Sequence, residues 1–477
     1  MTMSVRFPSY TLRFTALGLC SLLGASLLLG DAAAADPIAA TATPYQQGLA
    51  ALKAKNTTEA IARFSACAAD PAGAIVGGAP DEDGCVWQLG WAYWLQNDWA
   101  NVVSAWEPIE RRNPSYQTLA RDLAAARAQI AGAAAAQAAR ANAPATIPPS
   151  TAAPTALRLR AVGDLMIGTL FPEGALAPDD AVGTFDAVRS TLVDADLTFG
   201  NLEGPLCDNP APSDKCKPDA KPGSCYAFRS PTRYAPLYTA AGFDAVSTAN
   251  NHAGDFGDAC RTETEQALDA QGIRWSGRAG TTAEWVVNGK KVALVGFHTN
   301  MVCNYVNDTP AAVALVQQLV SRNDIVIVSF HGGAEGSKAQ HVPVGHEMFY
   351  NEDRGDLREF THAVVDAGAD LVLGHGPHVL RGMEIYKDRL IAYSMGNFAT
   401  YGRFNLSGAQ GVGEILEVGV AADGSFTSGR IFGTVQVDNG RPVPDPKNQA
   451  ADLVRALTAA DFPEHGAHVA LDGTFGK

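Results

Sequence analysis

The sequence predicts a small all-helical domain followed by a larger α/β domain. Apolar residues recur with helical periodicity from Pro44 to about Ile130. From Leu157 onward, short apolar runs of strand length alternate with helical stretches, which is the pattern of an α/β fold. The length supports this division, because 477 residues exceed one typical domain.

The first 35 residues have the layout of a secretory signal. Arg6 and Arg13 precede an apolar stretch, and Ala32 to Ala35 supply an A-x-A cleavage site. No later run approaches the ~18 consecutive apolar residues of a membrane span. We therefore expect a secreted protein, periplasmic or at the cell surface, with no membrane span in the mature chain.

The chain is acidic. Its 36 Lys and Arg residues face 50 Asp and Glu residues, so the formal net charge is −14. Binding to a phosphate backbone requires clustered positive charge. Nucleic acid is therefore not expected as a partner.

The helical domain is expected over residues 44–141. Its small and aromatic residues stand at spacings that resemble a tetratricopeptide repeat, with Gly90 and Trp106 in one repeat and Gly48 and Phe64 in a weaker first copy. Such a TPR-like domain would dock a protein partner. The alternative is a plain helical hairpin that has no partner.

The α/β domain is expected over residues 157–440, between a Pro- and Ala-rich linker at 142–156 and a C-terminal extension at 441–477. Strands are predicted at 159–167, 197–202, 245–249, 285–287, 292–297, 324–330, 369–373, 389–395 and 414–420. Helices are predicted at 185–193, 231–241, 261–271 and 353–367. Late strands without intervening helices favour two sheets packed face to face, with helices outside.

Seven cysteines remain after the expected cleavage, and export favours disulfides. We expect Cys67 to pair with Cys85, and Cys260 to pair with Cys303. The other three, Cys207, Cys216 and Cys225, lie in one loop that has no apolar periodicity and needs a covalent restraint. The odd count leaves one thiol unpaired.

Polar side chains follow several of the predicted strands. The carboxyl ends of neighbouring strands converge on one edge of an α/β sheet, so we expect these side chains to form one site. The expected metal ligands are Asp164, Glu203, Asn251, His331, His375 and His378. Oxygen and imidazole ligands together suit Mn, Fe or Zn better than Ca. Six ligands can hold one divalent ion, or two that share a bridging carboxylate.

The motifs at these strand ends resemble those of the CapA family of capsule and poly-γ-glutamate synthesis proteins. They are Gly163-Asp164-Leu165-Met166, Gly200-Asn201-Leu202-Glu203, Asn250-Asn251-His252, His331-Gly332-Gly333, Gly374-His375-Gly376-Pro377-His378 and Tyr393-Ser394-Met395-Gly396-Asn397-Phe398. The resemblance covers roughly residues 157–436. That family is similar to the calcineurin-like metallophosphoesterases, which implies a four-layer α/β/β/α sandwich with a dinuclear metal site.

The resemblance also implies residue roles. The six expected ligands would hold the metal, and His252 would be the general acid that protonates the leaving group. Met166 stands where metallophosphoesterases carry a histidine ligand, so one of the two metal positions is expected to be weak or absent. Four further histidines lack the repeated strand-end context and are expected to be structural: His298, His341, His346 and His362.

Two classes of function fit this sequence. The first is a metal-dependent hydrolase that acts on a phosphoester, or on the amide bonds of a poly-γ-glutamate-like polymer of the cell envelope. The second is a non-catalytic assembly or export factor for a surface polymer, which docks a membrane partner through the helical repeats.

Overall fold

The computed structural model describes residues 42–70, 79, 83–147, 154–209, 213, 215–216 and 225–477. The predicted signal segment lies outside these residues. The chain forms two compact units that divide between Ala135 and Ala136. None of the helices in the described ranges combines the length and the hydropathy needed to traverse a bilayer.

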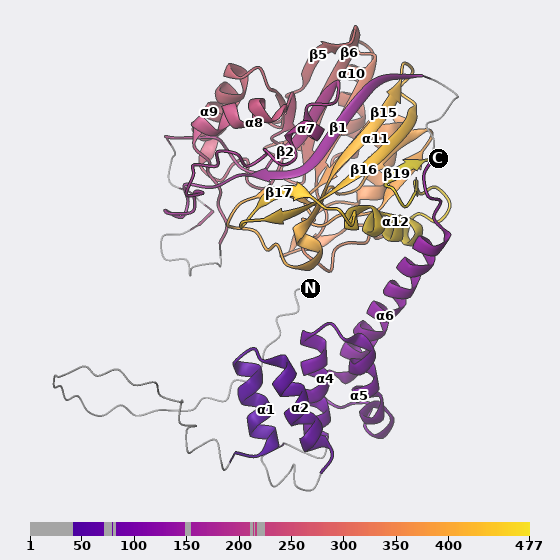
Figure 1. Ribbon diagram of the computed structural model, residues 1–477. Coiled ribbons are helices and arrows are strands. Elements are labelled where there is room, and N and C mark those ends of the chain that lie inside the picture. Colours follow the sequence, from indigo (N-terminus) through magenta and orange to yellow (C-terminus); the bar gives the residue numbers. More distant parts are fainter. Residues whose placement is uncertain are drawn as a thin grey trace, which may run out of the picture. The chain divides into compact units, whose positions relative to one another are not determined.

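The described part of the N-terminal unit contains helices and connecting turns but no strand, as predicted, and it is rich in tryptophan. Its helices are α1 (Pro44–Lys53), α2 (Thr57–Ala68), α4 (Gly84–Leu95), α5 (Trp99–Arg112) and α6 (Leu119–Asn142), the last of which runs past the division (Figure 1). Polar side chains cap the N-termini of three of these helices. Thr43 forms a capping box with Gln46 at α1, and the side chains of Asn56 and Asp98 accept backbone N–H groups of α2 and α5.

Two helix pairs of this unit pack through the same arrangement of glycine and aromatic ring. A Cβ atom at Gly48 of α1 would lie 2.6 Å from the ring of Phe64 in α2. A Cβ atom at Gly90 of α4 would likewise collide with the indole of Trp106 in α5. Trp106 also stacks on Trp87, with ring centroids 4.7 Å apart. Each glycine therefore allows an aromatic ring of the next helix to approach the helix backbone.

Gly90→Ala should destabilise the N-terminal unit, because the new methyl group overpacks Trp106. We expect the free energy of unfolding to fall by about 1–3 kcal/mol, measured by urea titration with tryptophan fluorescence. Gly132 in the exposed part of α6 is the control, since a Cβ atom there meets nothing within 4 Å. Gly132→Ala should raise stability by roughly 0.5–1 kcal/mol. Equal effects of the two substitutions would contradict this packing.

The second unit is mixed α/β and contains two large sheets, both as predicted. Among the described residues, the larger sheet has ten strands: β1 (Thr155–Met166), β2 (Leu197–Leu202), β3 (Ala245–Ser247), β4 (Arg274–Ser276), β14 (Asn397–Thr400), β15 (Val412–Ala421), β16 (Phe426–Val437), β17 (Arg441–Pro444), β18 (His468–Val469) and β19 (Thr474–Gly476). The main order is β18-β19-β16-β15-β1-β2-β3-β4. Strands β1 to β4 are parallel neighbours, and β15 joins β1 antiparallel.

The smaller sheet has seven strands within the described ranges: β5 (Ala283–Val287), β6 (Lys290–His298), β7 (Asn304–Tyr305), β8 (Ile325–His331), β11 (Leu371–His375), β12 (Met383–Tyr386) and β13 (Arg389–Ala392). Its order is β12-β13-β11-β8-β6-β5, with β7 beside β6. Strands β6, β8, β11 and β13 are parallel. The predicted hairpin at Asn288-Gly289 joins β5 to β6. A short pair, β9 (Met348–Phe349) and β10 (Glu352–Asp353), lies outside both sheets.

Helices connect and cover these strands. They are α7 (Arg189–Leu192), η1 (Thr232–Tyr234), α8 (Ala235–Ala241), α9 (Gly257–Ala270), α10 (Thr309–Val320), α11 (Leu357–Asp366), η2 (Gly408–Gly411) and α12 (Gln449–Asp461). One apolar cluster joins Leu159 of β1 to Ile327 of β8, so the main core lies between the two sheets. A second cluster packs α8 and α9 on the larger sheet, and a third packs α10 and α11 on the smaller sheet.

The C-terminal residues 441–477, expected as an extension, contribute strands to the larger sheet. Strand β17 pairs with β16 along Val435 and Val443, and β19 pairs with β16 through Phe475 opposite Gly429. The ring of Phe475 occupies the space that a side chain at Gly429 would need. An aromatic ring from the end of the chain therefore fills the space left by a glycine of β16.

Three disulfides lie in the described residues: Cys67–Cys85, Cys207–Cys260 and Cys216–Cys225. The first was predicted, but the predicted pair Cys260–Cys303 is wrong. Thr264 of α9 exchanges hydrogen bonds with the backbone of Leu206, at 2.9 and 3.1 Å, and this turns the preceding helical turn toward Cys207. Cys260 therefore reaches Cys207, and Cys303 is a buried free thiol.

Candidate metal centre

The register of the strands determines which polar side chains meet at the site. Asp164 on β1 is aligned with Asn201 on β2 and with Asn397 on β14. On the smaller sheet, His331 of β8 is aligned with His375 of β11. All of these residues except Asn397, which begins β14, lie at or near the carboxyl ends of their strands. The parallel pairing therefore brings polar side chains from distant parts of the sequence together.

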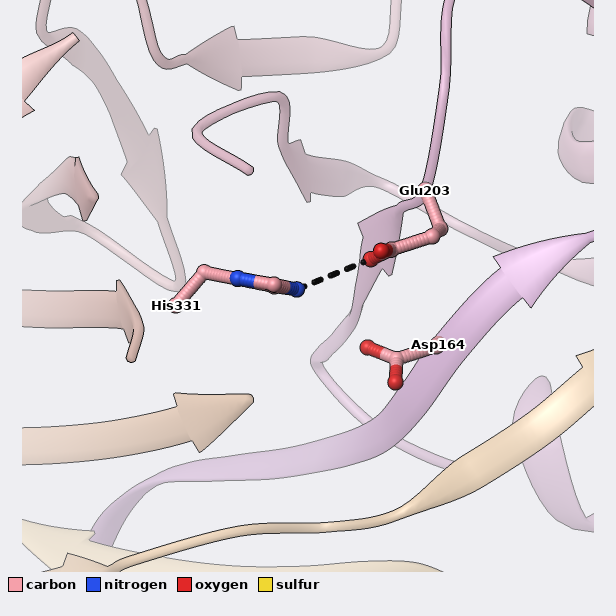
Figure 2. A group of neighbouring side chains, drawn as sticks. All are labelled: Asp164, Glu203 and His331. Atoms are coloured by element: carbon pink, nitrogen blue, oxygen red, sulfur yellow. Dashed lines mark ion pairs between the residues drawn. The ribbon is translucent and has the colours of Figure 1, made fainter. Parts of the chain in front are cut away.

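Asp164, Glu203 and His331 form a buried group suited to a cation. One ligand atom of each lies within 4.8 Å of the others. His331 Nε2 is 3.2 Å from Glu203 Oε2, and Asp164 points into the same space from β1 (Figure 2). Two carboxylates and an imidazole at this spacing are the ligand types of Mn, Fe and Zn sites.

His375 and His378 both lie against the carboxylate of Asp164. His378 Nδ1 is 2.9 Å from Asp164 Oδ2, and His375 Nδ1 is 3.4 Å from Asp164 Oδ1. The turn between the two histidines requires Gly376, which has φ +116° and approaches the backbone of Gly332 so closely that a Cβ atom would lie 2.6 Å from its oxygen. His378 itself has φ +58°, a strained conformation that aims its ring at Asp164.

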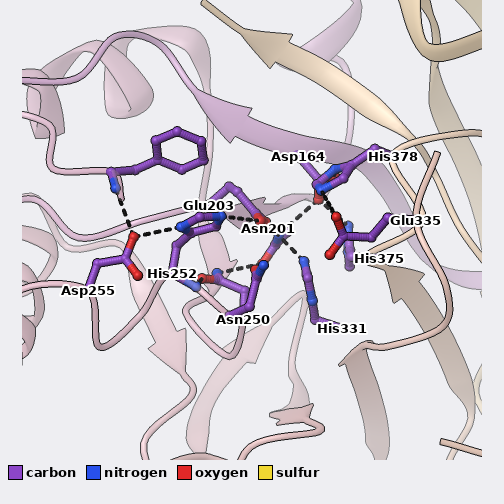
Figure 3. A network of polar contacts seen from close by, with 12 residues as sticks. Asp164, Asn201, Glu203, Asn250, His252, Asp255, His331, Glu335, His375 and His378 are labelled. Atoms are coloured by element: carbon purple, nitrogen blue, oxygen red, sulfur yellow. Dashed lines mark hydrogen bonds and ion pairs between the residues drawn. The ribbon is translucent and has the colours of Figure 1, made fainter. Parts of the chain in front are cut away.

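Two asparagines hold the carboxylates in place. Asn201 Nδ2 donates to Asp164 Oδ1 at 2.8 Å and to Glu203 Oε2 at 2.5 Å. Asn250 Nδ2 in turn donates to Asn201 Oδ1 at 3.1 Å (Figure 3). Asn250 thus orients the Asn201 amide, and this amide fixes the separation of the two carboxylates that would share a cation.

His252 lies on the Glu203 side of the site. Its Nδ1 is 2.6 Å from Asp255 Oδ2, and its Nε2 is 3.9 Å from Glu203 Oε1 (Figure 3). Asp255 also accepts hydrogen bonds from the backbone N–H of Phe228 at 2.8 Å and from Lys215 Nζ at 3.0 Å. A carboxylate fixed in this way orients the imidazole, with Nδ1 toward Asp255 and Nε2 toward the interior of the site.

Several ligand-type atoms of the site are buried without a hydrogen bond. They are Glu203 Oε1, Asn251 Oδ1 and both ring nitrogens of His331 and of His375. Buried polar atoms almost always have partners, because an unpaired one costs about 1–3 kcal/mol. These atoms lie at the ends of strands of both sheets, and their oxygen and imidazole donors fit a divalent cation.

The charges of the site are arranged around this space. Burial, with a contribution from the Asp164 charge, raises the pKa of Glu203 to about 7. Burial opposes ionisation of Asp164, but the imidazoles of His375 and His378 hold its pKa well below the usual range. Burial lowers the pKa of His331 far below its ordinary value, so this ring is neutral at pH 7. A neutral imidazole is the form that binds a metal.

The sequence profile of the bacterial capsule synthesis proteins called PGA_cap matches residues 158–401. This range contains every element that contributes to the site just described. The chain belongs to this family.

Individual relatives agree with the family assignment. The capsule biosynthesis protein CapA of Bacillus anthracis is 28% identical over an alignment of 271 residues, and the match covers 51% of this chain and 59% of the relative. The PGA biosynthesis protein CapA of Bacillus subtilis (strain 168) is 27% identical over an alignment of 257 residues, and the match covers 50% of this chain and 61% of the relative. The chain therefore spans about three fifths of the length of these two family members.

The structure brings together five of the six expected ligands of this family member: Asp164, Glu203, His331, His375 and His378. Asn251 precedes His252, which reaches the site, and its buried Oδ1 accepts no hydrogen bond within the described part of the chain. Met166, where a histidine ligand was expected by resemblance, is buried on β1. Its thioether offers neither of the ligand types that the rest of the site uses.

The sequence indicated Asn201 and Glu335 only as residues that shape the pocket, and it gave Asn250 and Asp255 no separate role. Asn201, Asn250 and Asp255 were visible in the motifs, but only the structure shows that they orient Asp164, Glu203 and His252. Glu335, in the loop after β8, has Oε2 3.9 Å from His378 Nε2. The signal for Glu335 in the sequence was its place four residues after His331.

Glu414 of β15 is a buried carboxyl whose titration should weaken the fold. Burial raises its pKa from 4.5 to about 8, and its Oε2 has no hydrogen bond. Below pH 4.5 the acid is protonated in both the folded and unfolded states. Between that pH and about 8 the unfolded chain releases the proton more readily, so the free energy of unfolding falls as the pH rises.

Glu414→Gln should remove this loss of stability. We expect the variant to match the wild type near pH 4.5 and to exceed it by on the order of 3 kcal/mol at pH 8, measured by urea unfolding across pH. The exposed Glu173 provides the control, and Glu173→Gln should change stability by less than about 0.5 kcal/mol at either pH. A difference between Glu414→Gln and wild type that does not grow with pH would contradict this expectation.

Proposed function

We propose that this protein is an exported, metal-dependent hydrolase of the phosphoesterase type that acts in the synthesis of a surface polymer. The observation that carries the proposal is the buried group of Asp164, Glu203 and His331, surrounded by ligand atoms that have no hydrogen bond. The names of the relatives, which refer to capsule and PGA biosynthesis, supply the biological setting.

The architecture supports the same class of enzyme. Two sheets enclose one core, and helices pack on the outer face of each sheet. We propose that this is the four-layer α/β/β/α sandwich of the calcineurin-like metallophosphoesterases. A divalent ion held in the site would polarise a phosphoryl or carbonyl oxygen and lower the pKa of a bound water.

The residues of this chain have distinct roles in the proposed reaction. Asp164, Glu203 and His331 bind the ion, and Asn201 keeps the two carboxylates apart. As an imidazolium, His252 donates Nδ1–H to Asp255 and faces the site with Nε2–H. It gives the Nε2 proton to the departing oxygen and is left as a neutral ring. Phe228 packs on the His252 ring at 4.1 Å between centroids and limits the access of water.

One ion position is better formed than the other. Glu203, Asn251 and His331 carry atoms without hydrogen bonds, whereas His378 is already engaged with Asp164 at 2.9 Å. Met166 adds no suitable ligand on the Asp164 side. We therefore propose one tightly bound ion, with any second ion held weakly between Asp164, His375 and His378.

The test is hydrolysis by the purified protein after loading with Mn²⁺, Fe²⁺ or Zn²⁺. Aryl phosphate mono- and diesters are the first substrates, and a γ-glutamyl peptide tests amide-bond chemistry. We expect turnover of a phosphoester that is lost in His331→Ala together with bound metal. A metal-loaded wild type that hydrolyses neither phosphoesters nor the peptide would overturn the proposed activity.

A non-catalytic role in polymer assembly or export is the second candidate. It is favoured by the N-terminal unit, where Gly48 with Phe64 and Gly90 with Trp106 repeat one packing arrangement, as in TPR-like domains that bind partners. If the full-length chain recovers a polymer synthase from membranes, and His331→Ala neither prevents this nor reduces polymer output, the assembly role is favoured over hydrolysis.

The disulfides support export to the periplasm or cell surface. Cys67–Cys85, Cys207–Cys260 and Cys216–Cys225 are placed in both compact units. Disulfides form and persist in oxidising compartments and are rare in the cytosol. Fractionation of cells that express the full chain would test the assignment, and recovery only in the cytosol with reduced thiols would contradict it.

A further inference from the structure

We infer that His298, at the end of β6, is an additional ligand of the metal centre on its Glu203 and Asn251 side. The inference rests on the metal site proposed above and adds to it a residue that the sequence motifs did not indicate. It follows from strand register, from ring geometry and from the surroundings of β6.

The register places His298 in one row with two expected ligands. His298 of β6 is aligned with His331 of β8, and His331 is aligned with His375 of β11. Residues aligned on neighbouring strands project from the same face of a sheet. The three imidazoles therefore leave the smaller sheet on the face that carries the site.

The distance between rings suits a shared ion. The ring centroids of His298 and His331 are 5.2 Å apart, and the ring planes are inclined by 54°. A metal–nitrogen bond is about 2.0–2.1 Å, so two imidazoles bound at a tetrahedral angle have centroids on the order of 5 Å apart. His331 and His378, on opposite sides of the site, are 6.3 Å apart.

The surroundings of β6 direct His298 toward the Asn251 side. Gly296, two residues earlier and on the same face of the strand, lies against Ser247 and Ala249, where a Cβ atom would come within 2.9 Å of Ser247 Oγ and 3.2 Å of Ala249 Cβ. The chain after Ala249 continues directly into Asn250 and Asn251. The end of β6 therefore faces the loop that carries the amide ligand.

The described contacts of His298 give no other reason for a histidine at this position. Its side chain is 3% exposed, and neither ring nitrogen makes a hydrogen bond. An imidazole buried in this way loses its hydration without a protein partner, which is costly. A phenylalanine would fill the same space without this penalty, so a pure packing role does not account for the histidine.

The test compares metal binding by wild type, His298→Phe and His298→Gln in the full chain. His298→Phe keeps a ring of similar size, and His298→Gln guards against a variant that fails to fold. The matched control is His362→Phe, because His362 is half-buried on α11 and pairs with Glu384 at 2.9 Å, away from the site. The readouts are Zn²⁺ affinity by competition titration and the visible absorption spectrum of the Co²⁺-loaded protein.

We expect both His298 variants to bind Zn²⁺ at least about tenfold more weakly than wild type and to show a changed Co²⁺ spectrum, while the control does neither. In metal-free protein, His298→Phe should be at least as resistant to urea as wild type, because it removes unpaired polar atoms. Unchanged affinity and spectrum in both His298 variants would overturn the inference. A wild type that binds no metal would instead defeat the metal site itself, and His298 with it.

Discussion

His331→Ala should abolish tight metal binding while the protein remains folded. His331 joins the smaller sheet to Glu203 of the larger sheet through a 3.2 Å approach, and it is the imidazole of the group with Asp164 and Glu203. Removal of a residue that only hydrogen-bonds to a metal ligand lowers metal affinity about 10–100-fold, and removal of a ligand itself lowers it more. We expect the purified variant to contain less than about one tenth of the wild-type metal.

The control for this prediction is a histidine outside the site. His362 stacks on Tyr386 at 3.8 Å between ring centroids. His362→Ala should keep the wild-type metal content, measured by plasma mass spectrometry on protein with a circular dichroism spectrum like that of wild type. Equal metal in His331→Ala and wild type would exclude His331 as a ligand.

His252→Gln should retain metal but lose most hydrolytic activity. The ring reaches toward the site through Nε2 and is fixed through Nδ1 by Asp255, so it is placed to protonate a leaving group. Loss of a general acid lowers kcat by about 10²–10⁴-fold. The decrease should be larger for phenyl phosphate than for 4-nitrophenyl phosphate, because the better leaving group needs less protonation.

Asp255→Asn separates positioning from proton transfer. Asp255 contacts His252 and not the substrate space, so its loss should lower kcat less than His252→Gln and should alter the pH profile of kcat. Metal content should be unchanged in both variants. A His252→Gln variant that hydrolyses phenyl phosphate at the wild-type rate would assign the acid role elsewhere.

Much of the fold could be predicted because the strands of the core are strongly apolar. Strand β2 begins and ends at the predicted residues, Leu197 and Leu202, and Asn288-Gly289 predicted the β5–β6 hairpin. Strand β16 was not predicted. Glycines such as Gly429 weaken the strand pattern, and the reason for Gly429 is the ring of Phe475, which lies far along the sequence.

The site could be predicted as a set of residues but not as an arrangement. Polar residues directly after apolar strands pointed to Asp164 and His331, and both belong to the buried group. His298 also follows a predicted strand directly, yet it was assigned a structural role. Its alignment with His331 depends on β6 and β8 being neighbours in the sheet. The local periodicity of a sequence does not predict the order of strands in a sheet.

The disulfide error has the same physical origin. Nothing in the local sequence around Cys260 or Cys303 indicates the partner of either residue. The actual pairing depends on which face of α9 meets the segment after β2, and Thr264 sets this through its two hydrogen bonds to Leu206. Contacts of this kind follow from helix placement and not from composition.

The central claim is that Asp164, Glu203 and His331 bind a divalent ion. The most direct test is the metal stoichiometry of the purified wild-type protein after loading with Mn²⁺, Fe²⁺ or Zn²⁺ and removal of free metal. The structure predicts about one tightly held equivalent per chain for at least one of these metals. Less than about 0.1 equivalents with every metal, in protein that is folded, would contradict the claim.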